Sequence, residues 1–143
     1  MEKNTLILWL LTILCWGFSP ILEKLGLKKV DPLIALFIRT FTALLSISFF
    51  LLFTGTYQQI KDISFKAFFI IGLSGILAGF LGMYFYFSLL KLHPASQIVP
   101  LTATYPLIAS ILAIMFLKEP VTLSKLLGIF LIVLGIYLLL KNP

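Results

Sequence analysis

Polar side chains inside long apolar runs are the residues of this sequence that could do chemistry. The densest group lies between Leu90 and Pro120, where Gln97, Thr104 and Tyr105 interrupt an otherwise apolar helical pattern. Amide and hydroxyl groups donate and accept hydrogen bonds, but they do not form the nucleophile and base pairs of an enzyme. The pattern therefore predicts either contacts to a polar solute in a cavity or hydrogen bonds between helices, and it leaves both open.

Arg39 lies about two turns inside another apolar run, on one helical face with small and hydroxyl residues such as Ala35 and Thr42. A guanidinium exposed to lipid costs about 2.5–3.5 kcal/mol at mid-bilayer, so it should face protein, a cavity or the headgroups. One interpretation is a contact to an anionic group of a substrate. The other is an arginine whose long side chain reaches the nearby interface.

Three aromatic residues complete the predicted cavity. Trp16 falls on a polar stripe with Thr12, Ser19 and Glu23 at 100° per residue. Tyr84 and Tyr86 point in roughly opposite directions on their helix, and the pattern does not decide which of them faces the cavity. The predicted cavity or substrate-binding residues are Trp16, Arg39, Tyr84, Tyr86, Gln97, Thr104 and Tyr105.

The rest of the sequence offers no catalytic or metal-ligating group. Cys15 is the single cysteine and His93 the single histidine, so neither a disulfide within the chain nor a metal site is expected. The lysines are dispersed through loops and form no dense basic face, which argues against nucleic acid as a partner in spite of a net charge of +6. We predict a protein that is not an enzyme and needs no cofactor.

The elements that position these residues are transmembrane helices. The chain has 143 residues, of which 61% are hydrophobic and 11% charged, and the charges separate apolar runs of about 20 residues. This pattern predicts one all-α domain over residues 1–143, a polytopic transmembrane bundle in the lipid membrane. Its five helices are predicted at about 6–23, 32–53, 65–90, 95–117 and 123–140.

The first apolar run could be mistaken for a cleaved leader. It lacks a small-x-small cleavage site, and Thr12-Ile13-Leu14 before Cys15 does not match a lipoprotein signal. We therefore keep this run as a transmembrane helix of the mature protein.

Glycine and proline predict how the helices pack and where they bend. Small residues let helix backbones approach closely in lipid, and two sets of glycines recur at helical spacing. These predicted packing glycines are Gly72, Gly75, Gly79 and Gly82 in one helix and Gly128 and Gly135 in another. Pro100 and Pro106 each remove a backbone hydrogen bond, so they predict a distorted helix that faces protein or a wet cavity.

The lysines show no bias between the two sides of the membrane. With five spans, Lys3, Lys61, Lys66, Lys118 and Lys125 lie on one side. Lys24, Lys28, Lys29, Lys91 and Lys141 lie on the other. Because positive charges set orientation, equal numbers predict insertion in both orientations and an antiparallel homodimer with a two-fold axis in the membrane plane.

Several motifs resemble the EamA-type unit of the drug/metabolite transporter superfamily. They are Trp16-Gly17, Pro32 followed by Arg39, Tyr84-Phe85-Tyr86, Lys91-Leu92-His93-Pro94-Ala95-Ser96, Pro106 and Leu117-Lys118-Glu119-Pro120. The resemblance covers the whole chain and implies a central cavity lined by the first four helices. Full-length members look like two such units in inverted orientation that export amino acids or other small metabolites, whereas this chain resembles one unit.

The resemblance implies a secondary transporter of small metabolites, an exporter that works by alternating access in a prokaryotic inner or plasma membrane. The related small multidrug resistance proteins use a glutamate in the middle of their first helix. Here that position reads Leu14-Cys15-Trp16-Gly17, which argues against proton-coupled cation export by that mechanism. The alternative is an accessory or flippase-like subunit that acts on a lipid-linked substrate or with a different partner protein.

Overall fold

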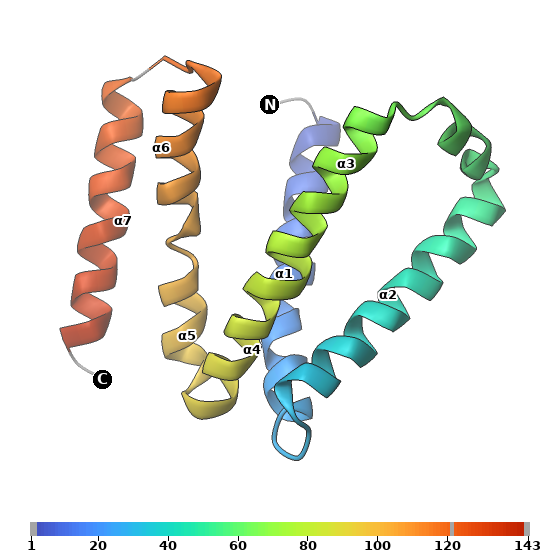
Figure 1. Cartoon of the computed structure of the whole chain (residues 1–143). Helices are drawn as coiled ribbons and strands as arrows, with labels where there is room; N and C mark the ends of the chain where they lie inside the picture. The colour runs from blue at the N-terminus through green and yellow to red at the C-terminus, as the bar shows by residue number, and fades with distance from the viewer. Residues whose placement is uncertain (1–2, 121, 142–143) are drawn as a thin grey trace. The chain divides into compact units, whose positions relative to one another are not determined.

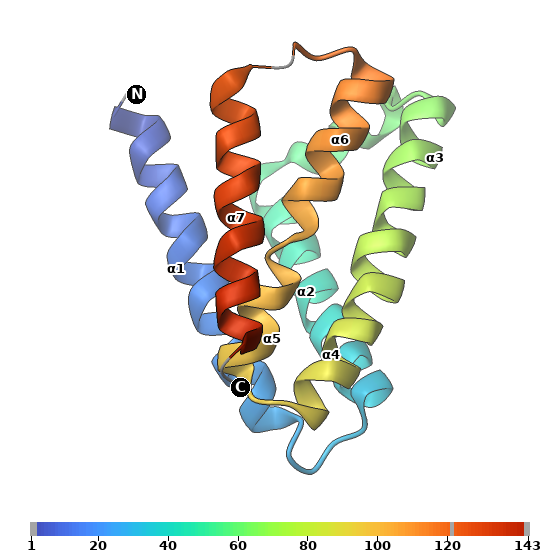
Figure 2. The ribbon, with the colours of Figure 1, turned by 90° about the vertical axis from the view of Figure 1, so that its left-hand side faces the viewer.

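All secondary structure in the described part of the chain, residues 3–120 and 122–141 of this computed structural model, is helical. The helices form two compact units that divide between Leu92 and His93, and Figures 1 and 2 trace the helices of each. The predicted all-α class is confirmed. The predicted domain limits at Met1 and Pro143 lie outside the described residues, and the single-domain organisation stays a prediction.

Four helical stretches are long and apolar enough to cross a membrane: Asn4–Gly26, Pro32–Thr54, Phe65–Leu92 and Ala95–Leu117. A fifth, shorter apolar helix, α7 (Leu123–Lys141), has 19 residues and is about 28 Å long. That length is close to the thickness of a hydrocarbon core. The polytopic bundle predicted from the sequence is therefore confirmed as four long helices and a shorter one.

Local sequence signals place both ends of the second helix but not the end of the first. Helix α1 (Lys3–Gly26) continues through Pro20 and ends later than predicted. The side chain of Asp31 accepts a hydrogen bond from the backbone N–H of Leu33 at 2.8 Å, and Pro32 occupies the first turn of α2 (Pro32–Thr54). Gly55 ends α2 with a left-handed φ of 72°, a conformation that glycine adopts without steric cost.

The third span is a continuous helical run whose middle is widened. It follows the 3₁₀ helix η1 (Thr56–Asp62) and consists of α3 (Phe65–Ser74), the π-helix η2 (Gly75–Gly82) and α4 (Met83–Leu92). A π-helix has i→i+5 hydrogen bonds and more residues per turn than an α-helix. Gly75, Gly79 and Gly82 lie in η2, so this part of the predicted glycine stripe does not follow the 100° per residue on which the prediction was based.

The core of the first unit lies where α4 meets α1 and α2. Its buried apolar side chains are Leu27, Leu36, Phe87 and Leu90. Lys24 donates to the backbone carbonyls of Leu90 and Lys91, and Lys91 donates to the carbonyl of Val30 at 2.9 Å. These bonds fasten the end of α4 to the end of α1 and to the turn before α2.

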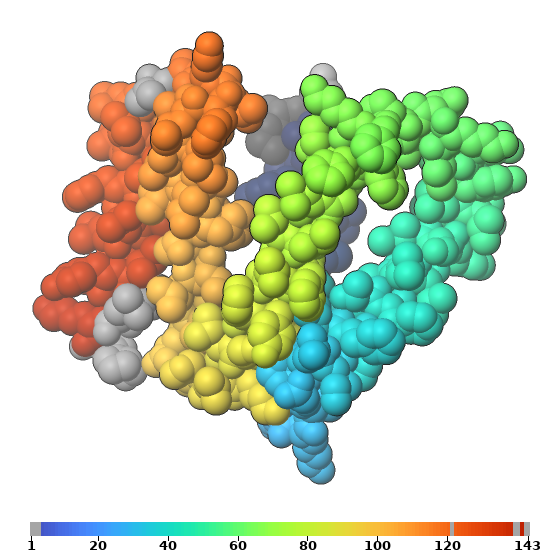
Figure 3. Space-filling model, in the orientation of Figure 1, coloured from blue at the N-terminus to red at the C-terminus, as the bar shows by residue number. Residues whose placement is uncertain are grey.

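Away from this core the first unit opens. Helices α2 and α3 diverge toward η1, and Figure 3 shows a gap between them on the face in view. Most apolar side chains of α2 and α3 are exposed within the chain, as expected for helices that meet lipid or a partner.

The second unit contains a broken helix and α7, which run side by side in both ribbon views (Figures 1 and 2). Helix α5 (Ala95–Thr102) stops at Ala103, and α6 (Tyr105–Leu117) restarts with Pro106 in its first turn. Pro106 has no N–H to offer the preceding turn, so backbone bonding is interrupted there. The Thr104 hydroxyl donates to the carbonyl of Leu101 at 2.7 Å, and the Thr102 hydroxyl donates to that of Ile98 at 2.8 Å.

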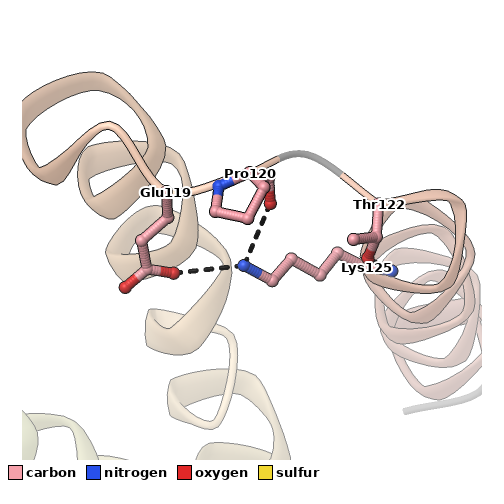
Figure 4. Close-up of polar contacts among 4 residues, drawn as sticks. All are labelled: Glu119, Pro120, Thr122 and Lys125. Carbon is pink, nitrogen blue, oxygen red and sulfur yellow. Dashed lines mark hydrogen bonds and ion pairs between the residues drawn. The ribbon is translucent and has the colours of Figure 1, made fainter.

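The connection from α6 to α7 carries its own ion pair (Figure 4). The ammonium of Lys125 lies 3.1 Å from a carboxylate oxygen of Glu119 and donates to the carbonyl of Pro120 at 3.2 Å. The Thr122 hydroxyl accepts from the backbone N–H of Lys125 at 3.3 Å and so caps the start of α7.

Candidate functional site

The first unit contains a cavity of about 350 Å³ at the end where α1, α2 and α4 meet. Its apolar walls come from all three helices and from the turn between α1 and α2. The lining residues are Ser19, Leu22, Glu23, Gly26, Val30, Ala35, Ile38, Arg39 and Phe87. Cavities of 300–1,000 Å³ with mostly apolar walls and a few polar groups are typical of small-molecule sites.

An ion pair between α1 and α2 is the charged feature of this cavity. The Nε of Arg39 lies 3.3 Å from the Oε1 of Glu23, and the Ser19 hydroxyl donates to the same oxygen at 2.9 Å. The side chain of Glu23 is 11% exposed and that of Arg39 is 46% exposed. Both residues lie within stretches long and apolar enough to span a membrane, so the two charges compensate one another where water is scarce.

The sequence of each helix explains why the two side chains meet. Ser19 and Glu23 are one helical turn apart on the polar stripe of α1. The Asp31 cap reverses the chain, and about two turns of α2 then bring Arg39 back to the level of Glu23. Ala35 and Gly26 are small, which leaves room for the cavity beside the pair.

Of the sequence-predicted site residues of the first unit, Arg39 lines the cavity and Tyr86 lies within electrostatic range of Arg39 and Glu23. Arg39 lines the cavity with a protein partner rather than only reaching the interface. Trp16, Tyr84 and Tyr86 are not among the cavity's lining residues. Trp16 and Tyr84 are exposed, whereas Tyr86 is half-buried with its ring centroid 6.1 Å from that of Phe87, which does line the cavity. The substrate contacts of these aromatic residues stay predictions.

The remaining predicted residues belong to the second unit. Gln97 and Thr104 are half-buried on either side of the break between α5 and α6, and Tyr105 is exposed. The Thr104 hydroxyl is occupied by the carbonyl of Leu101. A role for these three side chains in one cavity with Arg39 stays a prediction.

Glu23 and Ser19 are the cavity residues that the candidate list from the sequence does not contain. Glu23 looked like a charge at the end of its helix because the helix was predicted to stop at that residue. In the structure α1 continues to Gly26, which places the carboxylate inside the span. The signal that could have found it is the polar stripe of Thr12, Trp16, Ser19 and Glu23, whose last two residues line the cavity together with Arg39.

Comparison with known proteins agrees with these membrane helices. The chain matches the EamA-like transporter family over residues 3–141, which is nearly its whole length. It belongs to this family. The family is one of transporters, so this EamA chain is a multi-pass integral membrane protein of a transporter family rather than a member of an enzyme family.

Three relatives give the scale of the match. The chain is 28% identical to an "uncharacterized transporter in cobO 3'region" of a Sinorhizobium species, and the match covers 86% of each chain. It is 26% identical to an uncharacterized transporter of Archaeoglobus fulgidus over 88% of this chain but 44% of the relative. A Methanocaldococcus jannaschii protein, MJ1333.1, is 42% identical over 47% of this chain and 48% of its own.

No solved structure matches the chain significantly. The three relatives come from prokaryotes, which fits an inner or plasma membrane location. The chain spans less than half of the Archaeoglobus transporter, so that relative has room for a second unit of the same size.

Proposed function

We propose that this chain is half of a secondary transporter for small metabolites, an exporter that works by alternating access as an antiparallel homodimer. Each protomer supplies one five-helix unit, and two units in opposite orientation enclose the substrate pathway. The cavity beside the Glu23–Arg39 pair is part of that pathway.

The observation that carries this proposal is the relation in length between the chain and its relatives. The match to the Archaeoglobus transporter covers 88% of this chain but only 44% of that relative. The match to the Sinorhizobium transporter covers 86% of each chain, so the two chains have a similar length. A carrier built of two inverted units in one chain can equally be built of two copies of one unit, provided that the copies insert in opposite orientations. The lysine balance of five against five permits this insertion.

The exposed glycines favour a second copy as the packing partner. A methyl group added at Gly72, Gly75, Gly79, Gly128 or Gly135 would meet no described atom within 4 Å, apart from the adjacent residues and the backbone of its own helix within four residues. Small residues in membrane helices usually allow the close approach of another helix. We propose that these glycines, together with the diverging faces of α2 and α3, meet the other protomer.

Dual topology is tested with reporters fused to the C-terminus. One fusion carries a fluorescent protein that matures in the cytoplasm, and the other carries a phosphatase that is active only outside it. We expect both reporters to be active in cells that express the fusions at equal levels. Activity of one reporter alone would contradict dual topology and would require a separate partner or a parallel dimer.

A pair of charge variants tests whether the two orientations work together. Gln58→Lys/Gln59→Lys adds positive charge to η1, whereas Lys61→Gln/Lys66→Gln removes it from the same side of the membrane; all four side chains are exposed. We expect each variant to insert in one orientation and to be inactive alone, and co-expression of the two to restore export. Full activity of either variant by itself would overturn the antiparallel dimer.

Transport itself is tested with the purified chain in liposomes. Counterflow of labelled metabolites from a screening panel is expected for a transporter. Movement of a lipid-linked headgroup across the bilayer without metabolite exchange would instead support the flippase-like alternative. Activity that appears only after addition of another protein would support the accessory alternative.

A further inference from the structure

We propose that the Glu23–Arg39 pair selects the charge of the transported solute and that the cavity takes small dipolar solutes, which carry one cationic and one anionic group. This inference rests on the proposed function, because it names the class of substrate for the same pathway. It is argued from the bonding capacity, burial and charge balance of the pair.

Both partners keep bonding capacity after they have paired. In the described part of the chain, Oε1 of Glu23 lies 3.3 Å from the Nε of Arg39 and accepts a hydrogen bond from the Ser19 hydroxyl, so Oε2 stands outside both contacts. The 3.3 Å contact is made by Nε of Arg39 and not by its two terminal nitrogens, and the phenol of Tyr86 lies within electrostatic range of both charges. A guanidinium has five N–H donors and a carboxylate has about four acceptor positions. The pair can therefore accept from a solute ammonium and donate to a solute carboxylate at the same time.

The charge balance of the cavity sets the sign of the solute. Glu23 and Arg39 cancel one another, and the other lining residues carry no formal charge. A solute with a single charge would bring an uncompensated charge into a region where charges are costly. A solute with both charges adds none, and each of its charged ends meets an open group of opposite sign.

The rest of the lining suits a small apolar substituent on such a solute. Leu22, Ile38 and Phe87 provide apolar contacts, and the small residues Gly26 and Ala35 leave space between them. The volume of about 350 Å³ is at the lower end of ordinary ligand sites, so the solute is small.

The test measures binding of probes with one carbon skeleton and different charge. Leucine carries both charges, leucinamide only the cation and 4-methylpentanoate only the anion. Each labelled probe is bound at millimolar concentration to the purified full-length chain in detergent. A charge-assisted hydrogen bond corresponds to about 10- to 100-fold in affinity, so we expect the chain to bind leucine tighter than either other probe by that factor.

Variants of the pair should change the preferred charge in opposite directions. Glu23→Gln leaves Arg39 uncompensated and should shift the preference to 4-methylpentanoate. Arg39→Gln leaves Glu23 and should shift it to leucinamide, whereas the double variant should lose the discrimination. Glu119→Gln removes the exposed pair beside α7 and should leave the wild-type order of the three probes unchanged.

If a single variant fails to fold, the swapped pair Glu23→Arg/Arg39→Glu provides a second test of the proposal. It restores one charge of each sign, and we expect it to keep the dipolar preference. Size-exclusion chromatography reports the folded assembly of each variant.

The proposal is overturned if the wild-type chain does not bind leucine or binds a singly charged probe more tightly. It is also overturned if Glu23→Gln and Arg39→Gln leave the order of affinity for the three probes unchanged. Uptake into liposomes separates this failure from failure of the proposed function. Charge-selective binding without transport of any solute would preserve the site and contradict the transporter. Transport of other solutes that is unaffected by substitution of Glu23 or Arg39 would support the transporter and contradict the charge-selective site.

Discussion

The two ion pairs of this chain have the same chemistry and nearly the same length but very different surroundings. Glu119 in the connection after α6 and Lys125 in the first turn of α7 are 3.1 Å apart, with side chains 47% and 40% exposed. Glu23 and Arg39 are 3.3 Å apart on two different helices, and the glutamate is 11% exposed. The shorter pair is local in sequence and open to its surroundings, whereas the longer one joins two spans beside a cavity.

This difference teaches that distance alone does not rank ion pairs. An exposed pair contributes about 0–1 kcal/mol because water already solvates both charges and salt screens them. A buried pair can add little net stability as well, but the loss of one partner leaves an uncompensated charge that costs about 3–5 kcal/mol. The turn pair therefore contributes to local order, and the functional role of the interhelical pair is the proposal that the variants below test.

The largest expected effect is that of Arg39→Leu. It removes the partner of the Glu23 carboxylate, whose side chain is 11% exposed, and we expect it to lower the free energy of unfolding by about 3 kcal/mol. Equilibrium unfolding in mixed micelles of SDS and a mild detergent measures this. The double variant Glu23→Gln/Arg39→Leu is the control and should recover part of the loss. A loss no greater than that of the turn pair would contradict the comparison.

Glu23→Gln should cost less than Arg39→Leu although it breaks the same pair. The arginine left behind is about half exposed and its long side chain can reach water or headgroups, so we expect a loss of about 1–2 kcal/mol. The same unfolding experiment checks the asymmetry. Equal losses for the two variants would indicate that Arg39 is as confined as Glu23.

Ser19→Ala removes a neutral donor from the carboxylate and leaves the ion pair in place. One such hydrogen bond contributes about 1 kcal/mol, which is the loss in unfolding free energy that we expect. Ser46→Ala is a matched control, because the Ser46 hydroxyl bonds only the backbone of its own helix. An effect of Ser19→Ala no larger than that of Ser46→Ala would show that Ser19 does not support Glu23.

The smallest expected effect is that of Lys125→Gln in the turn. We expect a loss of about 0.5 kcal/mol that disappears at high salt, because both side chains are exposed. Unfolding at low and high ionic strength measures it, and the cost of Arg39→Leu should change far less with salt. A salt-independent loss in the turn variant would mean that this pair is more enclosed than its exposure indicates.

The beginnings of α2 and α7 follow from sequence because their signals are local. Asp31 followed by Pro32 predicts the start of α2, and Thr122 predicts that of α7; both side chains make capping bonds. The end of α1 was predicted at residue 23, before its observed end at Gly26. The helix continues because membrane helices tolerate an internal proline when neighbouring groups satisfy the freed backbone atoms, and Pro20 itself is buried.

The candidate site was predicted only in part. Arg39 was identified because a charge inside an apolar run is unusual, but its partner was not. Finding Glu23 requires the relative rotation of α1 and α2, which a pattern along one helix does not contain. The π-helix η2 was missed for a related reason, since the helical wheel assumes the α-helical repeat that η2 departs from.

The sequence by itself determined the membrane class, the apolar helices and the family, because length, hydropathy and capping signals act within a segment. Only the tertiary structure decided that Arg39 faces Glu23 beside a cavity rather than standing alone near the interface. The reason is physical: hydropathy is a property of one helix and its solvent, whereas an ion pair between helices depends on their register and rotation. That pair connects the fold of this EamA-family chain to a prediction about its solute.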